Sequence, residues 1–343
     1  MVFVAVHVGA GCHPRRLEQA YTALCTQACK KGIRDLKHGA AVADVCADVC
    51  AMLEDSPLTN AGRGSNLNVH GRIECDASIM DTRTGRGAAV GAVYGVRSPV
   101  RLALRVLTAS FDQLSHGRIA PTNIVGDGAY EFATTHGVET CTNEDLQTAE
   151  SVARFERWSG IVNGNGRPIG GAETDADADA VTDTVGVVCV DADGHVAVAS
   201  SSGGVALKQP GRTGPAAMLG SGTWATADHG RATAVCCSGT GEDIINGCLG
   251  SRAAAALADS DDVLAEAGAF LRTEAARPGL QAHPAALGFM FVQQQPRSRG
   301  RTVELAFAHT TESMCVGYMA GGDRTATVTM SRNSAPGEPV AAG

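Results

Sequence analysis

A threonine preceded by a removable segment is the strongest chemical feature of the sequence. Thr184 stands in the run Asp183-Thr184-Val185-Gly186, where a polar stretch gives way to an apolar one. A threonine hydroxyl is a weak nucleophile unless a base lies beside it. If the bond before Thr184 is cut, the new α-amine, with an ordinary pKa of about 7.7–8, supplies that base. The pattern predicts a self-cleaving hydrolase, and a threonine that merely opens a strand is the alternative.

Three runs of small residues follow this threonine and carry further chemical groups. Ser202 precedes a Gly-Gly pair, Arg212 lies in Pro-Gly-Arg-Thr-Gly, and Ser238-Gly239 lies in Cys-Ser-Gly-Thr-Gly. A guanidinium binds a carboxylate through two parallel hydrogen bonds. A hydroxyl and a backbone N–H together stabilise a developing oxyanion. The third run also fits a glycine turn that caps a helix at residue 241, and the two readings are compatible.

With these residues, three long segments resemble the plant-type asparaginase family of N-terminal-nucleophile hydrolases, and within it the threonine aspartase (taspase) branch. The segments are TNAGRGSNLNVHGRIECDASIMD (59–81), DTVGVVCVDADGHVAVASSSGGVALKQPGR (183–212) and HTTESMCVGYM (309–319). Together with matching flanks they cover most of the chain outside a linker at about 141–182 and a C-terminal tail. The resemblance implies catalytic roles for Thr184, Ser202, Ser238 and Gly239, and substrate-binding roles for Arg212, Lys208 and Asn60.

One position departs from the asparaginase pattern. Asparaginases carry an aspartate three residues after the arginine, where it binds the free amine of the substrate, and this chain has Pro215 there. The departure favours a threonine endopeptidase that cuts itself between Asp183 and Thr184 and then cleaves protein substrates after an internal aspartate. An isoaspartyl peptidase/L-asparaginase is the alternative within enzymes, and a catalytically silent binding protein is the alternative outside them.

The elements that must position these residues follow from hydrophobic periodicity and from turn residues. In the first half we expect strands at 2–8, 72–80 and 87–94 and helices at 15–37, 40–54, 98–112 and 123–137. In the second half we expect strands at 184–190, 195–200, 233–237, 286–293, 302–309 and 313–320, with helices at 241–257 and 261–275.

Two runs of strands, each with its own helices, favour an α/β (α+β) fold with four layers. The resemblance implies the αββα sandwich of N-terminal-nucleophile hydrolases. Residues 1–183 would form the α part and residues 184–343 the β part of one domain. Within these parts we expect a flexible linker at about 141–182 and a loose tail at about 332–343.

Composition narrows the remaining possibilities. The formal charge of −8 argues against direct nucleic-acid binding, and no apolar run is long enough for a membrane span. The spacing of the 12 cysteines fits buried, reduced thiols better than a zinc module. The threonine chemistry needs no metal or organic cofactor, so we expect neither. We expect an intracellular protein, cytoplasmic and/or nuclear, although the acidic linker lacks a basic nuclear signal. The family implies an αβ heterodimer made from one chain and pairing of two such units.

Overall fold

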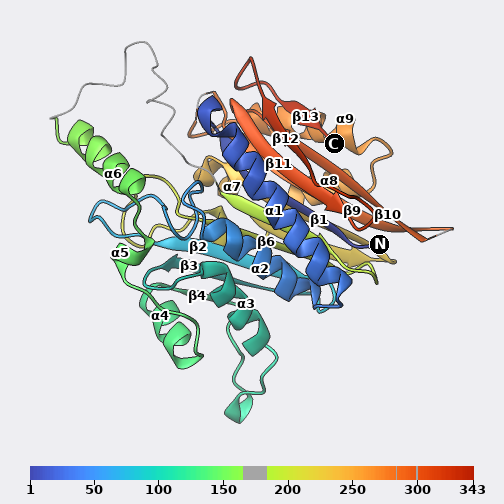
Figure 1. Cartoon of the computed structure of the whole chain (residues 1–343), viewed down its shortest axis with the longest axis horizontal. Helices are drawn as coiled ribbons and strands as arrows, with labels where there is room; N and C mark the ends of the chain where they lie inside the picture. Colours follow the sequence, from blue (N-terminus) through green and yellow to red (C-terminus); the bar gives the residue numbers. More distant parts are fainter. Residues whose placement is uncertain (165–183, 283, 299) are drawn as a thin grey trace.

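The computed structural model describes residues 1–164, 184–282, 284–298 and 300–343. Two β-sheets pack face to face, and each sheet carries helices on its outer face (Figure 1). The expected αββα sandwich is therefore confirmed. The two sheets meet through small and branched apolar side chains, including Val188 and Val198 from one sheet and Ala234, Met290 and Val292 from the other.

The larger sheet has eight strands in the described part of the chain, in the order β12-β11-β1-β5-β6-β2-β3-β4. Neighbouring strands are antiparallel except β3 and β4, which are parallel. Strand β1 (FVAVHVGAG) is almost wholly buried because it lies near the centre. The strands, in chain order, are β1 (Phe3–Gly11), β2 (Cys75–Asp81), β3 (Arg86–Val93), β4 (Asn123–Val125), β5 (Val185–Val190), β6 (Val196–Ser202), β11 (Ser313–Ala320) and β12 (Thr327–Arg332).

The smaller sheet has the strand order β13-β10-β9-β8-β7, and its neighbouring strands are antiparallel. Strands β9 and β10 form its long central hairpin and are joined by ten residue pairs. The strands are β7 (Thr223–Asp228), β8 (Arg231–Gly239), β9 (Leu287–Arg297), β10 (Gly300–His309) and β13 (Val340–Ala342).

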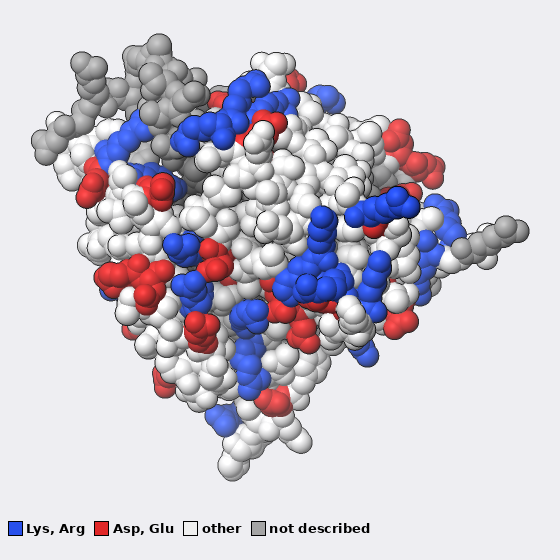
Figure 2. Space-filling model, viewed as in Figure 1, with Lys and Arg blue, Asp and Glu red and all other residues white. Residues whose placement is uncertain are grey.

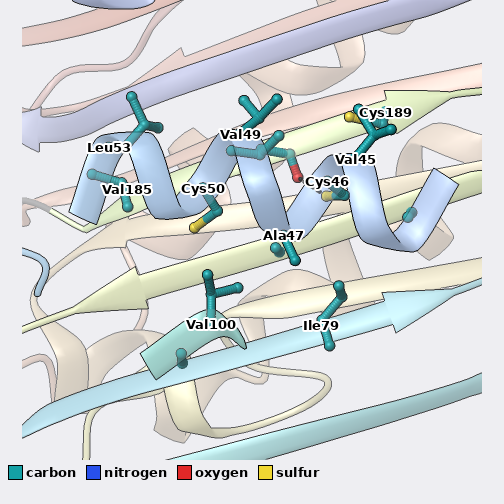
Figure 3. Close-up of a cluster of buried hydrophobic side chains, with 14 of the residues drawn as sticks. Val45, Cys46, Ala47, Val49, Cys50, Leu53, Ile79, Val100, Val185 and Cys189 are labelled. Carbon is teal, nitrogen blue, oxygen red and sulfur yellow. Dashed lines mark hydrogen bonds between the residues drawn. The ribbon is translucent and has the colours of Figure 1, made fainter. Parts of the chain in front are cut away.

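Helices cover the outer face of each sheet. On the larger sheet, α2 buries an apolar stripe, and Figure 3 shows Leu53 and Cys50 of this helix near Val185 of β5 and Cys46 near Cys189 of the same strand. The helices of this layer are α1 (Glu18–Lys37), α2 (Val42–Glu54), α3 (Pro99–Ala109) and α4 (Gly126–Thr135). On the smaller sheet the helices are α7 (Gly241–Gly247), α8 (Leu249–Ala258) and α9 (Val263–Ala275).

The structure corrects the expected linker and tail. Two helices, α5 (Asn143–Leu146) and α6 (Ala149–Val162), occupy the start of the expected linker because capping boxes at Thr142 and Thr148 begin them. Residues 165–183 lie outside the described residues. The expected loose tail contains β13, which extends the smaller sheet by pairing with β10. Strands β7 and β12 were not predicted; each lies at or next to a sheet edge and is partly exposed.

Charges on the molecular surface are mixed in sign. On the face shown in Figure 2, Lys and Arg side chains are interspersed with Asp and Glu. Lys31 of α1 contacts Asp35 and, at 3.4 Å, Asp48 of α2, and Asp48 also pairs with Arg101 of α3. These pairs link neighbouring helices at the surface. Within the described ranges, every helix is too short or too polar to cross a membrane.

Candidate active site

The first residue of the candidate site is Thr184, which immediately precedes strand β5 in the middle of the larger sheet. Side chains alternate along a strand. Val185 and Val187 face the helices, whereas Val188 and Val190 face the other sheet. The alternation therefore directs Thr184 between the two sheets, and the residue is only 3% exposed.

Ser238 of the opposing sheet lies against this threonine. The Thr184 backbone N–H donates to Ser238 Oγ at 3.4 Å, and the Ala10 N–H of β1 donates to the same oxygen at 2.9 Å. A hydroxyl has two lone pairs and one hydrogen. Because both lone pairs accept, the Ser238 hydrogen is left to donate, as a group that stabilises an oxyanion must do.

The register of the larger sheet lines up three polar side chains. Val185 pairs with Ser201, so Thr184 comes opposite Ser202 when the ladder is continued by one residue. Ser202 in turn pairs with Asp76 of β2. Directly opposed residues have Cβ atoms about 4.5–5.5 Å apart. Thr184, Ser202 and Asp76 thus form a row across three adjacent strands, facing the smaller sheet.

Asp76 is a buried carboxylate that the sequence analysis did not single out. It accepts hydrogen bonds from the Ala92 N–H at 2.8 Å and the Gly214 N–H at 2.7 Å. Burial raises the pKa of Asp76, and the Lys208 charge, the two backbone donors and the Arg212 charge oppose that rise. A charged residue inside the mostly apolar run CDASIM was the available sequence signal. Through Gly214, Asp76 fixes the loop that contains Arg212.

The guanidinium of Arg212 lies at the end of this row. Its Nε and Nη2 both donate to Glu242 Oε1, at 2.9 and 2.7 Å. A Cβ at Gly204 would lie 2.8 Å from Arg212 Nη1, and one at Gly241 would lie 2.6 Å from Nη2. A Cβ at Gly214 would lie 3.1 Å from Arg212 Nη1 and 3.3 Å from Asp76 Oδ2. Gly214 therefore lies between the arginine and the last residue of the row. Because these glycines lack a Cβ, the guanidinium can pack directly against their backbone.

Lys208 lies close to the arginine but is itself buried at 3% exposure. Its Nζ donates to the Glu74 carbonyl oxygen at 2.6 Å, and Glu74 Oε2 accepts from the Gly211 N–H at 2.9 Å. The structure therefore places Lys208 as a support for the Arg212 loop. Its charge also acts on Asp76.

Asn60 holds the turn that follows Ser202. Its Nδ2 donates to the Gly204 carbonyl at 2.8 Å, its Oδ1 accepts from the Asn66 N–H at 2.9 Å, and its carbonyl accepts from Gly203. The residue is fully buried. Its amide therefore fixes the Gly203-Gly204 turn that follows Ser202.

Gly239, the second residue expected at the oxyanion position, has a φ of +132°. A Cβ there would lie 2.2 Å from the Ala286 carbonyl oxygen. Only glycine fits this end of β8, so the backbone next to Ser238 is fixed by the sequence. Asp183, the expected residue before the cut, lies outside the described residues.

Glu54 is a second buried carboxyl group that sequence reasoning missed. Its oxygens accept hydrogen bonds from Ser98 Oγ and, at 2.9 Å, from the Val100 N–H. Burial raises the pKa of Glu54 to about 7, against the effect of these donors and of Ser201. A lone glutamate closing the apolar face of a helix was its only sequence signal. Through its carbonyl, which accepts from the Arg63 N–H at 2.8 Å, it holds the loop that contains Asn60.

His7 packs directly against the nucleophile strand. A Cβ at Gly186 would lie 2.1 Å from His7 Nε2 and 2.6 Å from Cys236 Sγ. Burial lowers the pKa of His7 to about 3. Gly186 lies two residues after Thr184. The neutral imidazole of His7 occupies the space that a side chain at this position would need.

Comparison with known proteins bears on this site. A sequence profile described as asparaginase matches residues 1–329. The chain is 34% identical over 335 residues to the plant-type L-asparaginase of Pyrobaculum calidifontis, covering 94% of this chain and 98% of that one. It is 34% identical over 243 residues to the isoaspartyl peptidase/L-asparaginase of Xenopus laevis, covering 71% of each. It is 32% identical over 251 residues to the isoaspartyl peptidase of Escherichia coli, covering 71% of this chain and 72% of that one.

These relatives contradict the expected threonine endopeptidase of the taspase branch and support the isoaspartyl peptidase/L-asparaginase alternative. The endopeptidase expectation depended on Pro215 having displaced the carboxylate of the pocket. The structure places another carboxylate next to Arg212. Pro215 lies beside Gly241, since a Cβ there would be 3.0 Å from Pro215 Cδ, and the next residue is Glu242. A carboxylate is therefore present on this side of Arg212 after all.

Proposed function

The chain belongs to the asparaginase family of hydrolases, and from that premise we propose that it is an isoaspartyl peptidase/L-asparaginase with Thr184 as its nucleophile. The observation that carries the proposal is the row of Thr184, Ser202 and Asp76, which faces Ser238 and ends at Arg212. This arrangement supports hydrolysis of an amide carried by the side chain of a free amino-acid unit.

The nucleophile must first be released. In the uncut chain, the Thr184 hydroxyl attacks the carbonyl of Asp183, the acyl group moves from nitrogen to oxygen, and water hydrolyses the ester. The Thr184 α-amine that results is a base next to its own hydroxyl. Cleavage leaves two polypeptides that form one αβ unit, and pairing of two such units remains part of the proposal.

In the reaction, Arg212 binds the α-carboxylate of the substrate and orients its side-chain amide toward Thr184. The Thr184 hydroxyl attacks the amide carbonyl while the α-amine takes its proton. Ser238 and the backbone at Gly239 stabilise the oxyanion. The amine returns the proton to the leaving group, which is ammonia from asparagine or the following residue's amine from an isoaspartyl peptide. Water then hydrolyses the ester and frees Thr184.

The proposal is tested with the purified chain and its Thr184→Ala variant at neutral pH. We expect the wild type to yield two fragments with Thr184 as a new N-terminal residue, and the variant to stay intact. We expect the cleaved protein to release ammonia from L-asparagine and to hydrolyse a β-aspartyl dipeptide, but to spare the matched α-aspartyl dipeptide. An uncut wild type that is inert on all three would refute the proposal and favour a binding protein.

A further inference from the structure

A substrate that enters this site as a free amino-acid unit carries an ammonium group as well as a carboxylate. Arg212 can bind the carboxylate, but an ammonium placed beside an arginine without a counter-charge is repelled and loses its hydration. The site therefore needs a carboxylate that is accessible and has an oxygen to spare. The described residues around Arg212 offer three candidates, namely Asp76, Glu74 and Glu242.

Two of these carboxylates are engaged in hydrogen bonds with the protein backbone. Asp76 uses Oδ1 for the Ala92 N–H and Oδ2 for the Gly214 N–H, and it is fully buried. Glu74 accepts from the Gly211 N–H through Oε2 and is 4% exposed. Neither can turn to a ligand without releasing the loop that carries Arg212.

Glu242 differs from both in exposure and in geometry. Its side chain is 46% exposed, while that of Arg212 is 16% exposed. Both hydrogen bonds from Arg212 converge on Oε1, so within the described part of the chain Oε2 is left without a donor. Arg212 fixes the orientation of the carboxylate and leaves one oxygen open.

Glycine backbone packs closely around the guanidinium of this pair. Glycines at 204, 214 and 241 surround the guanidinium, and any Cβ there would come within 3.1 Å of it. Arg212 Nη1 makes no hydrogen bond within the described residues, and Glu242 already holds Nε and Nη2. A substrate carboxylate at Nη1 and its ammonium at Glu242 Oε2 would each meet the opposite charge of the Arg212–Glu242 pair.

We propose that Glu242 is a specificity-determining residue that binds the ammonium group of the substrate through Oε2, while Arg212 binds its carboxylate. This inference rests on the proposed isoaspartyl peptidase/L-asparaginase function. It makes the enzyme selective for substrates with a free amine, because an N-acylated or des-amino analogue gives Glu242 no partner. In this proposal Glu242 of α7 provides the negative charge that Pro215 cannot provide.

The test compares the wild type with Glu242→Gln on ligands that differ only in the amine. The measurements are KM and kcat for L-asparagine and competitive inhibition constants for L-aspartate and for succinate. We expect Glu242→Gln to raise the KM for asparagine and the inhibition constant of aspartate about tenfold, typical of a lost charge-assisted hydrogen bond. We expect succinate to bind equally well or more tightly, because Arg212 loses its competing anion.

Two further variants separate recognition of the amine from a structural role. Glu242→Gln with Pro215→Asp should recover the affinity for aspartate, because it returns a carboxylate to the pocket. Glu304→Gln is the matched control, since Glu304 has a similar exposure of 42% and pairs with Arg297 on the smaller sheet. It should leave all constants unchanged.

The outcomes distinguish a failure of the Glu242 inference from a failure of the proposed function. If Glu242→Gln weakens succinate as much as aspartate, Glu242 only orients Arg212 and the inference is overturned. If the wild type turns over neither asparagine nor a β-aspartyl dipeptide, the proposed function fails and the inference fails with it. A selective loss for the ligands that carry the amine supports both.

Discussion

Replacing Glu54 by Gln tests whether a buried carboxyl group is held protonated behind the candidate site. Burial raises the pKa of Glu54 from 4.5 to about 7. Between those values the unfolded chain loses a proton that the folded chain keeps. The contribution of this group to stability is therefore fully present below pH 4.5 and is lost as the pH rises through about 7.

The expected loss of unfolding free energy follows from the difference between the two pKa values. They differ by about 7 − 4.5 = 2.5 pH units, and each unit corresponds to about 1.4 kcal/mol. The wild type should therefore lose about 3 kcal/mol of unfolding free energy between pH 4.5 and 7 through Glu54. The residue is only 1% exposed, so screening by solvent does not reduce this figure strongly.

The assay is urea unfolding between pH 4.5 and 8, with Thr184→Ala as the background so that the chain stays in one piece. Glu54→Gln should remove this fall, so its unfolding free energy should rise by about 3 kcal/mol relative to that of its parent between pH 4.5 and 8. His7 and His309, whose pKa values burial lowers to about 3 and about 4, destabilise the fold as the pH falls below 6.5. Their effect is the same in both proteins and cancels in the difference. Parallel curves for Thr184→Ala with and without Glu54→Gln would refute a protonated Glu54.

Two further predictions concern the neighbourhood of Thr184. Ser238→Ala removes the hydroxyl that accepts from Ala10 and Thr184, so kcat for L-asparagine should fall by about 10²–10³-fold; an unchanged kcat would exclude Ser238 from oxyanion stabilisation. Gly186→Ala places a methyl group 2.1 Å from His7 Nε2 and should cost about 3 kcal/mol or more in urea unfolding. Gly268→Ala, whose added Cβ meets nothing closer than 3.7 Å, is the control, and an equal cost in both variants would contradict the steric argument.

The layered fold could be read from the sequence because its central strands are apolar runs with a clear end. The run FVAVHVGAG becomes β1 and VGVVCV becomes β5, and both lie in the middle of the larger sheet. Strands at or near the edges gave a weaker signal. The sequence TWATAD of β7 is partly exposed and short, and the pairing of β13 with β10 depends on a contact that no local pattern encodes.

The candidate site was predictable only where a residue has a distinctive neighbourhood in the sequence. Thr184 follows an acidic segment, Ser202 and Arg212 lie in runs of small residues, and the structure brings the three into one row with Asp76. Asp76 itself was missed because its role depends on backbone donors from β3 and from the loop before Pro215. The importance of Glu242 was hidden for a similar reason, since it meets Arg212 across 30 residues of chain.

The order of strands in the larger sheet has a consequence for how the two parts of the chain stay together. Strand β1, from before residue 184, lies between β11 and β5, and strand β6, from after it, lies between β5 and β2. Strands from the two sides of the cut are thus interleaved. A break before Thr184 would make two molecules in the covalent sense but leave one larger sheet, because neither fragment contains all of its strands, whereas the smaller sheet comes entirely from residues after 184. The larger sheet must therefore assemble before the bond is broken, and the fragments can part only if this sheet comes apart.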